Sequence, residues 1–254
     1  MFLDSEKNVM FRKLTQGEEI EITKFDATFL DISKCQFSVE LGEDDFLLHK
    51  ISSKSGLKGS LIFNLYEAPT RTKKRTKKVM SDFKKEYCSG YYLSKELAKA
   101  YYGKRHYYCP YMTSNSLWAP LEGDSKGNVD YVNLGLTDSV SSYYSDQTIL
   151  FFVNEMEVVL PRDYSSAKSR LTQYMETYIL YFYALYLLNH EEGEFNPFAN
   201  WRGNCWKKYD YLIPKVMNKL TREQVNKIKM ACDFKHELKE SQVGDLIDGH
   251  YNHN

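Results

Sequence analysis

The stretch Gln147–Asn189 constrains the fold most, because it contains the densest run of apolar residues in the chain. Its first part predicts a β-hairpin. Thr148–Val153 and Met156–Leu160 are rich in the β-branched and aromatic residues that strands favour, and Pro161 would end the second strand. Between the two strands, Asn154-Glu155 supplies a two-residue turn.

A long helix is predicted to follow this hairpin. Ser165 or Ser166 can cap its first turn, because a serine oxygen accepts hydrogen bonds from free backbone amides. No Pro or Gly occurs before Gly193, so the helix can run for about 24 residues. Ile179–Leu188 is apolar on nearly every face, which predicts burial. The charge-free run Thr177–Leu188 is shorter than the roughly 20 residues that cross a bilayer, so we expect no membrane partner.

Shorter elements flank this centre. Strands are predicted at Glu19–Phe25, Gln36–Leu41, Phe46–Ile51 and Ser60–Tyr66. Their regular spacing favours an antiparallel meander. Towards the other end of the chain, Thr221-Arg222-Glu223-Gln224 is a capping box that opens an amphipathic helix.

The sequence therefore predicts an α+β fold in which mostly antiparallel strands pack on a long buried helix, with a C-terminal helical extension. We expect the mixed strand and helix core domain to span residues 1–190, and the extension and tail to span residues 191–254. Since 43% of the residues are hydrophobic and 15% are aromatic, the chain has ample material for such a core.

The five cysteines are scattered, odd in number and without a CxxC pair. Reduced thiols in the cytoplasm are the economical interpretation, and the N-terminus lacks the uninterrupted apolar segment of a signal peptide. Cys109 and Cys205 are the candidates for a nucleophile, but no histidine spacing singles out either thiol. We therefore predict no catalytic residue and no enzyme.

A zinc site is the other chemical reading of the C-terminal region. Cys232 and His236 lie one helical turn apart, and His250 and His253 are three residues apart. Zinc would need all four to converge, yet the second pair falls in a predicted frayed tail. We therefore predict no metal and no cofactor.

The charge is distributed very unevenly, although the net charge is zero. Residues 71–105 contain twelve Lys or Arg and three Asp or Glu, which gives +9 for this segment and −9 for the remainder. Within it, residues 70–78 read TRTKKRTKK. Mutual repulsion predicts that this run is exposed and mobile. Its cations could neutralise nucleic-acid phosphates, or the run could simply be a solvated loop. The candidate nucleic-acid-binding residues here are Arg71, Lys73, Lys74, Arg75, Lys77 and Lys78.

Tyrosine pairs follow the basic run at Tyr91-Tyr92, Tyr101-Tyr102 and Tyr107-Tyr108. Lys104 and Arg105 lie among them and are further candidates for nucleic-acid contact. Such aromatics can stack on bases or line a backbone groove, but they are more often amphipathic residues at the edge of a core.

Residues 90–190 contain a series of short motifs in a characteristic order. They are Gly103–Tyr111, Ser114, Trp118, Asn154, Leu160-Pro161, Tyr164 and Ser166. In this order, and not in overall identity, residues 90–190 resemble the competence transcription factor ComK family of Gram-positive bacteria. Glu155 stands where the family has the Gly of an Asn-Gly turn, and residues 195–254 have no counterpart.

The resemblance implies a cytoplasmic activator of DNA-uptake genes. Such a protein would bind paired A/T-rich boxes in double-stranded DNA as a homo-oligomer, largely through the minor groove, and an adaptor would direct a protease to it. Arg105 and Arg162 flank the matched segments and would be the residues that reach the groove.

Two other function classes remain open. The chain could be a protein-interaction module or adaptor whose basic run contacts an acidic partner. A nucleic-acid-processing enzyme is disfavoured, because no paired carboxylates stand near a lysine and no glycine-rich phosphate loop occurs.

Overall fold

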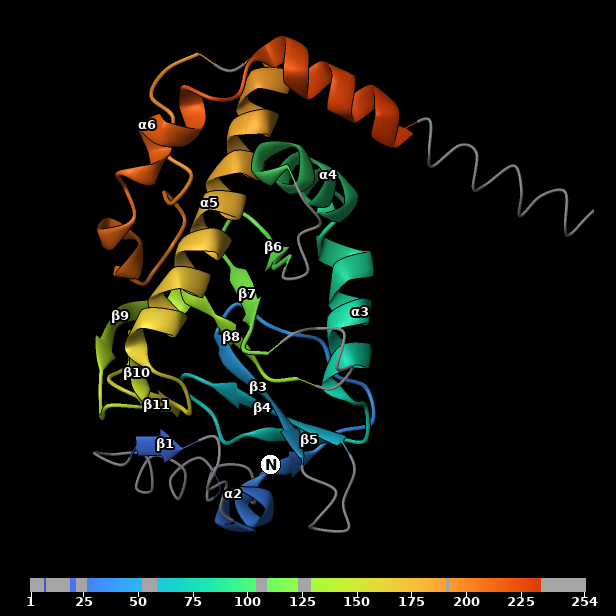
Figure 1. Ribbon diagram of the computed structural model, residues 1–254. Helices are drawn as coiled ribbons and strands as arrows, with labels where there is room; N and C mark the ends of the chain where they lie inside the picture. The colour runs from blue at the N-terminus through green and yellow to red at the C-terminus, as the bar shows by residue number, and fades with distance from the viewer. Residues whose placement is uncertain are drawn as a thin grey trace, which may run out of the picture.

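The structure, a computed structural model, describes residues 7, 19–21, 27–51, 59–103, 109–122, 129–190 and 192–233. Two sheets and one long helix organise it (Figure 1). The smaller sheet has the strand order β1-β11-β10-β9. Its strands are β1 (Glu19–Glu21), β9 (Thr137–Ser142), β10 (Thr148–Phe152) and β11 (Glu157–Leu160).

The larger sheet has the strand order β2-β5-β4-β3-β8-β7-β6. Only its β2–β5 pair is parallel, as is the β1–β11 pair of the smaller sheet. The prediction of an α+β fold with mostly antiparallel strands is confirmed. The strands are β2 (Lys34–Cys35), β3 (Asp45–Ile51), β4 (Gly59–Asn64), β5 (Thr70–Thr72), β6 (Tyr111–Met112), β7 (Leu117–Pro120) and β8 (Tyr131–Asn133).

The longest helix, α5 (Tyr164–Leu188), runs from the smaller sheet past the larger one, with α4 and α6 on either side of it (Figure 1). Short 3-10 turns η4 and η5 precede β9 and α6. No helix in the described part of the chain is long and apolar enough to cross a membrane. The remaining elements are α2 (Ala27–Ile32), α3 (Thr76–Tyr87), α4 (Tyr91–Tyr102), α6 (Leu212–Met217), a helix over 222–233, η4 (Leu134–Leu136) and η5 (Cys205–Lys208).

The larger sheet is covered on both faces. Leu47 and Leu61 belong to the main hydrophobic cluster, which includes much of α5. Their neighbours Leu48 and Ile62 belong to a second cluster, with Phe83 of α3. Because successive side chains of a strand point to opposite faces, α3 and α5 lie on opposite faces of this sheet.

The long helix matches the sequence prediction in place and length but not in its cap. Asp163, and not a serine, is the N-cap, and its carboxylate accepts a hydrogen bond from Ser166 N–H at 2.9 Å. This bond and a second from Ser165 N–H lower the pKa of Asp163. The expected all-round burial of Ile179–Leu188 is wrong for Tyr181, Phe182 and the last turn, Leu185–Leu188, which are only half-buried.

The predicted hairpin forms from β10 and β11, but its turn differs from the expectation. Phe152 N–H donates to Met156 O at 2.9 Å, and Glu155 N–H donates to Phe152 O at 2.9 Å. The loop therefore has three residues and not two. Glu155 takes the left-handed position with φ of 67°, which this type of loop requires after a type I turn.

Replacing Glu155 with Gly should raise the free energy of unfolding by about 0.5–1 kcal/mol. Gly adopts positive φ without steric cost, and this relief exceeds the extra chain entropy that Gly gives the unfolded state. Urea denaturation would measure the change. Glu157→Gly, in the extended backbone of β11, is the matched control and should lower stability. Equal effects at both positions would contradict the strain argument.

The N-terminal third only partly follows the prediction. Phe46–Ile51 and Ser60–Tyr66 correspond to β3 and β4, which pair in antiparallel fashion. The strand predicted at Gln36–Leu41 is wrong, since the described backbone there has no ladder, although Val39 and Leu41 are buried. The alternation of apolar residues therefore predicted burial correctly at Val39 and Leu41 but not at Phe37, which is 80% exposed.

The C-terminal segment packs on the main cluster. Trp201 and Leu212 belong to it together with α5 residues such as Tyr178. The Tyr178 hydroxyl accepts a hydrogen bond from Trp201 Nε1 at 2.8 Å, and Tyr178 stacks on Phe198 at 5.6 Å between ring centroids. A C-terminal helical extension is thus present, while the division of the chain at residue 190 stays a prediction.

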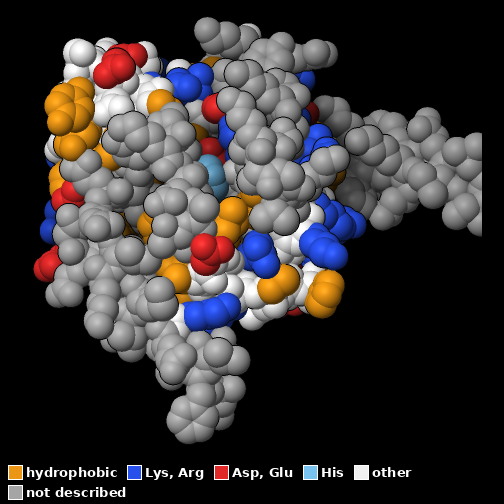
Figure 2. Space-filling model, turned by 90° about the horizontal axis from the view of Figure 1, so that it is seen from below, with side chains coloured by type: hydrophobic (Ala, Val, Ile, Leu, Met, Phe, Trp, Pro, Cys, Tyr) orange, Lys and Arg blue, Asp and Glu red, His pale blue; other side chains and the backbone are white. Residues whose placement is uncertain are grey.

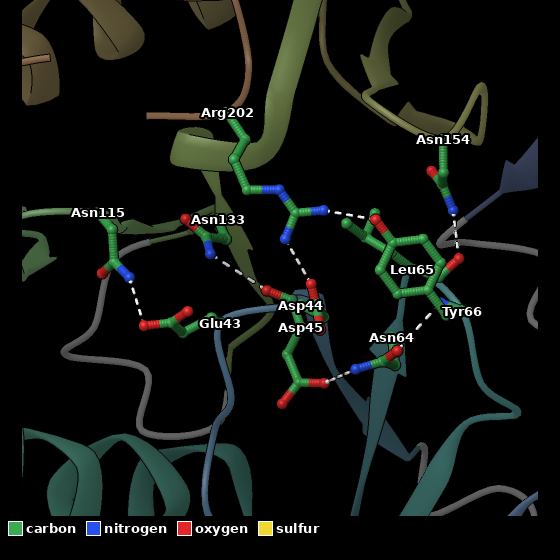
Figure 3. A network of polar contacts seen from close by, with 10 residues as sticks. All are labelled: Glu43, Asp44, Asp45, Asn64, Leu65, Tyr66, Asn115, Asn133, Asn154 and Arg202. Carbon is green, nitrogen blue, oxygen red and sulfur yellow. Dashed lines mark hydrogen bonds and ion pairs between the residues drawn. The ribbon is translucent and has the colours of Figure 1, made fainter. Parts of the chain in front are cut away.

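A polar network joins the ends of several of these elements (Figure 3). Arg202 of the C-terminal segment pairs with Asp44 and donates to the Tyr66 hydroxyl at 2.6 Å. At the hairpin tip, Asn154 donates to Leu65 O at 2.7 Å. Asn133 donates to Asp45 O at 3.1 Å. These bonds tie both sheets and the C-terminal segment together.

Candidate nucleic-acid interface

The basic run is part of a strand–turn–helix unit. Arg71 lies in β5, Arg75 is the N-cap of α3, and Lys77 and Lys78 occupy the first turn of α3. The expectation that residues 70–78 form a loose segment is wrong. Charge repulsion is outweighed here because α3 buries Val79, Met80 and Phe83 in the second hydrophobic cluster.

The turn between β5 and α3 is held from both sides. Ser60 Oγ donates to Lys74 O at 2.8 Å, and Lys74 N–H donates to Thr72 Oγ1 at 3.3 Å. Gly59 allows the close approach of β4, since a Cβ there would lie 2.0 Å from Thr72 O and its φ is 150°. The backbone that carries the cations is therefore fixed by its neighbours.

The cations of the run point outward from this support. Lys73, Arg75, Lys77 and Lys78 are exposed, whereas Arg71 and Lys74 are half-buried. Figure 2 shows Lys and Arg side chains gathered towards the right, the side on which β5 and α3 lie in Figure 1.

Two of the six cations share one carboxylate. Asp82 Oδ1 lies 2.7 Å from Lys78 Nζ, and Asp82 Oδ2 lies 3.0 Å from Lys74 Nζ. Hydrogen bonds from Lys78 and then Lys74 lower the pKa of Asp82. Within the described residues, no carboxylate forms an ion pair with Lys73, Arg75, Lys77 or Arg71, so these four carry most of the positive field.

The helix end adds to that field. The first turn of α3 contains no acidic residue, and the side chain of its N-cap residue, Arg75, makes no capping hydrogen bond. A helix N-terminus carries a partial positive charge, so placing Arg75, Lys77 and Lys78 there costs stability. An anion held beside these groups would offset that cost.

Aromatic side chains border the cations. Phe37 is 80% exposed and lies under Lys73 Nζ, which is 5.7 Å from the ring centroid. Tyr92 is exposed, and Lys84 Nζ lies 5.2 Å from its ring centroid. Tyr102 instead faces α5, where its hydroxyl donates to Glu176 at 2.5 Å. The tyrosine pairs at the two ends of α4 therefore differ. The pair in the first turn borders the cations, whereas the pair in the last turn packs inward.

Sequence reasoning left Phe37, Lys84 and Lys85 out of the site. The signal for the two lysines was helical spacing, because Lys84 and Lys85 follow Lys77 and Lys78 by seven residues and so lie on the same face of α3. Phe37 gave no local signal, since its position beside Lys73 depends on the pairing of β2 with β5.

The other predicted site residues do not join this surface in the described structure. Lys104 and Arg105 lie outside the described residues. Arg162 is half-buried after β11, where its guanidinium donates to Leu121 O at 3.3 Å. It lies on the α5 face of the larger sheet, and the sheet separates it from α3.

The cysteines are poorly placed for nucleophilic chemistry. Burial raises the pKa of the Cys88 thiol to about 12 and that of Cys109 to about 11. Burial also raises the pKa of Cys205. The described residues contain no cluster of His, Cys, Asp or Glu that could hold a metal ion, and three of the four predicted zinc ligands lie outside them. Cys232 is free.

Comparison of the chain with protein-family models, with curated proteins and with solved structures found no match in any of the three. The resemblance to the ComK family therefore stays a prediction based on the short motifs. The strongest candidate site is the one defined by charge. We name it the β5–α3 basic surface, and it comprises Arg71, Lys73, Lys74, Arg75, Lys77, Lys78, Lys84 and Lys85.

Proposed function

We propose that the protein binds duplex nucleic acid through phosphate contacts on the β5–α3 basic surface. The observation that supports this proposal is the set of cations on a fixed backbone. Lys73, Arg75 and Lys77 project from an ordered turn and helix, and no described carboxylate pairs with them. A preorganised row of cations releases condensed counterions from DNA with little loss of side-chain entropy on the protein.

The regulatory role that we propose is that of a cytoplasmic transcription factor of the competence type, acting on A/T-rich duplex DNA. This part rests on the resemblance of residues 90–190 to ComK, as do the oligomeric state and the protease adaptor. Arg105 remains the candidate for minor-groove contact, because Arg162 lies on the opposite side of the larger sheet from α3.

Changing Lys73, Arg75 and Lys77 together to Ala should weaken binding to every duplex by a similar factor. Each phosphate contact contributes about −0.9 to the slope of log affinity against log salt, so the triple variant should flatten this slope by up to about 3 units. Lys74 is left out because Asp82 already balances its charge. Fluorescence anisotropy at several salt concentrations would measure both quantities.

The matched control removes three exposed cations elsewhere, by Lys207→Ala, Lys219→Ala and Arg222→Ala. This variant loses the same net charge and should keep the wild-type slope. An equal loss of slope in both variants would contradict a local site. Tight binding to polyglutamate together with no binding to DNA at low salt would favour the alternative, an interaction module for an acidic protein.

Sequence preference is tested separately. Duplexes with A/T tracts one helical turn apart should bind more tightly than scrambled duplexes of the same composition, because narrow minor grooves attract arginine. Arg105→Ala should remove this preference. Phosphate binding without any A/T preference would leave the basic surface intact and would rule out the competence-type role.

A further inference from the structure

Phe37 has the highest exposed fraction of the large hydrophobic side chains in the described part of the chain, at 80%. A single exposed apolar residue is common on protein surfaces and means little by itself. Phe37, however, lies at the β5–α3 basic surface, where Lys73 Nζ is 5.7 Å from the centroid of its ring. Figure 2 shows hydrophobic side chains next to the Lys and Arg side chains on that side of the molecule. The basic surface therefore has an aromatic ring at its edge.

The backbone is held in place on both sides of Phe37. Gln36 N–H donates to Arg71 O at 2.9 Å, which extends the parallel pairing of β2 with β5. Two residues after the ring, Val39 is 5% exposed and belongs to the second hydrophobic cluster, together with residues of α3. Phe37 thus lies between two anchored residues. Because its ring also has few rotatable bonds, it loses little conformational entropy when it binds a partner.

One face of the Phe37 ring is open to a ligand. Lys73 lies over one face only, and an exposed fraction of 80% requires that the opposite face is in contact with solvent. An open aromatic face next to an ammonium group matches the two parts of a nucleotide, because the base can stack on the ring while a phosphate contacts the cation. Such stacking accepts any base, since every base has a π face.

A base inside a duplex cannot stack on Phe37 in this way. Its two faces are covered by the neighbouring base pairs, so aromatic side chains stack on bases that are unpaired. The phosphates of an adjoining duplex can still contact Lys73, Arg75 and Lys77, which are exposed. The surface as a whole therefore fits DNA in which a single strand continues from a duplex.

A second aromatic ring lies towards the other end of α3. Tyr92 is 56% exposed, and Lys84 Nζ is 5.2 Å from its ring centroid. Thr76 and Lys84 are separated by about 12 Å along the axis of α3, since each residue of a helix adds about 1.5 Å. Aromatic rings thus flank the cations at both ends of the helix. A row of cations with aromatic side chains beside it is typical of sites for single-stranded nucleic acid.

We propose that the β5–α3 basic surface binds DNA at an unpaired base next to a duplex, and that this base stacks on Phe37. The inference rests on the proposed function, because the phosphates on either side of the base are the groups that the cations hold. It adds a substrate class that phosphate contacts alone do not define, namely a junction of duplex and single strand such as an overhang or a gap. Stacking of one base on an aromatic side chain should tighten binding by about fivefold to 150-fold.

The test uses the full-length chain and three DNA probes: a blunt duplex, the same duplex with a thymine overhang, and the same duplex with an overhang of abasic sites. The two overhangs carry the same phosphates, so the cations do not distinguish them. Fluorescence anisotropy should show at least about fivefold tighter binding of the thymine overhang than of the abasic one. Equal binding of these two probes would overturn the inference while leaving phosphate binding in place. No binding of any probe at low salt would instead overturn the proposed function itself.

Three variants locate the stacked base. Phe37→Leu keeps an apolar side chain without an aromatic face, so it should bind both overhangs equally and keep the wild-type salt slope and melting temperature. Phe37→Trp has a larger ring and should keep the preference for thymine. Tyr144→Ala is the matched control, since Tyr144 is 63% exposed but lies between β9 and β10 of the smaller sheet. A preference for thymine that persists in Phe37→Leu, or that disappears in Tyr144→Ala, would overturn the assignment to Phe37.

Discussion

Replacing Leu180 with Ala should lower the free energy of unfolding by about 3–5 kcal/mol. Leu180 is 1% exposed and belongs to the main hydrophobic cluster, at the point where α5 is enclosed on all sides. Truncation removes packed methyl groups, and the close-packed surroundings can collapse only partly into the cavity that remains. Urea denaturation would measure this loss. The midpoints of the two proteins are compared, provided that their unfolding free energies depend equally on urea concentration.

The same substitution five residues later is the matched control. Leu185 lies on the same helix but is only half-buried. Leu185→Ala should cost clearly less than Leu180→Ala, because water can occupy the space at the edge of the core. Equal losses at the two positions would contradict the burial pattern of α5, and would restore the expectation of a helix buried all round to Leu188.

Local sequence patterns predicted the elements around α5 well. The absence of Pro and Gly from Asp163 to Asn189 allows the helix, and β-branched residues on both sides of Asn154 allow the hairpin. The details that failed depend on competition between neighbouring groups. Asp163 precedes the predicted serine caps, and its carboxylate accepts the Ser166 amide in their place. Sequence preference alone did not decide which oxygen would cap the helix.

Strand pairing could not be predicted from the sequence. β1 pairs in parallel with β11, although Ile20 and its partner Val158 lie far apart in the chain. A short apolar strand shows that one face is buried, but it carries no information about its partner. For the same reason, the sequence could not show that the larger sheet separates Arg162 from α3.

For the candidate site, the sequence predicted which segment is rich in cations but not which of these cations form a surface. The charge count singled out residues 71–105, yet it treated all cations as equivalent. The structure distinguishes them, because Asp82 balances Lys74 and Lys78 while Lys73 and Arg75 project into solvent. Sequence patterns also gave no indication that Phe37 lies beside Lys73, because this contact depends on the pairing of β2 with β5.

Asp45 should make the protein less stable as the pH rises from about 4 to 6. Its carboxyl is 7% exposed, and burial raises its pKa to about 6 against hydrogen bonds from Asn64 and Gly42 that act in the opposite direction. Below the unfolded pKa of 3.8, both states are protonated and the protein retains its full stability. Between the two values, the folded state keeps the proton that the unfolded state releases, so stability falls as the pH rises.

The loss should be complete above pH 6 and amount to about 3 kcal/mol, since one pKa unit corresponds to about 1.4 kcal/mol. Asp45→Asn removes the titrating group, so the wild type should lose stability relative to this variant from pH 4 to pH 7. Asp146→Asn, at an exposed position, is the control and should follow the wild type throughout. A constant difference between wild type and Asp45→Asn over this range would contradict a buried carboxyl in the network of Figure 3, because a solvated Asp45 would be ionised in both states already at pH 5.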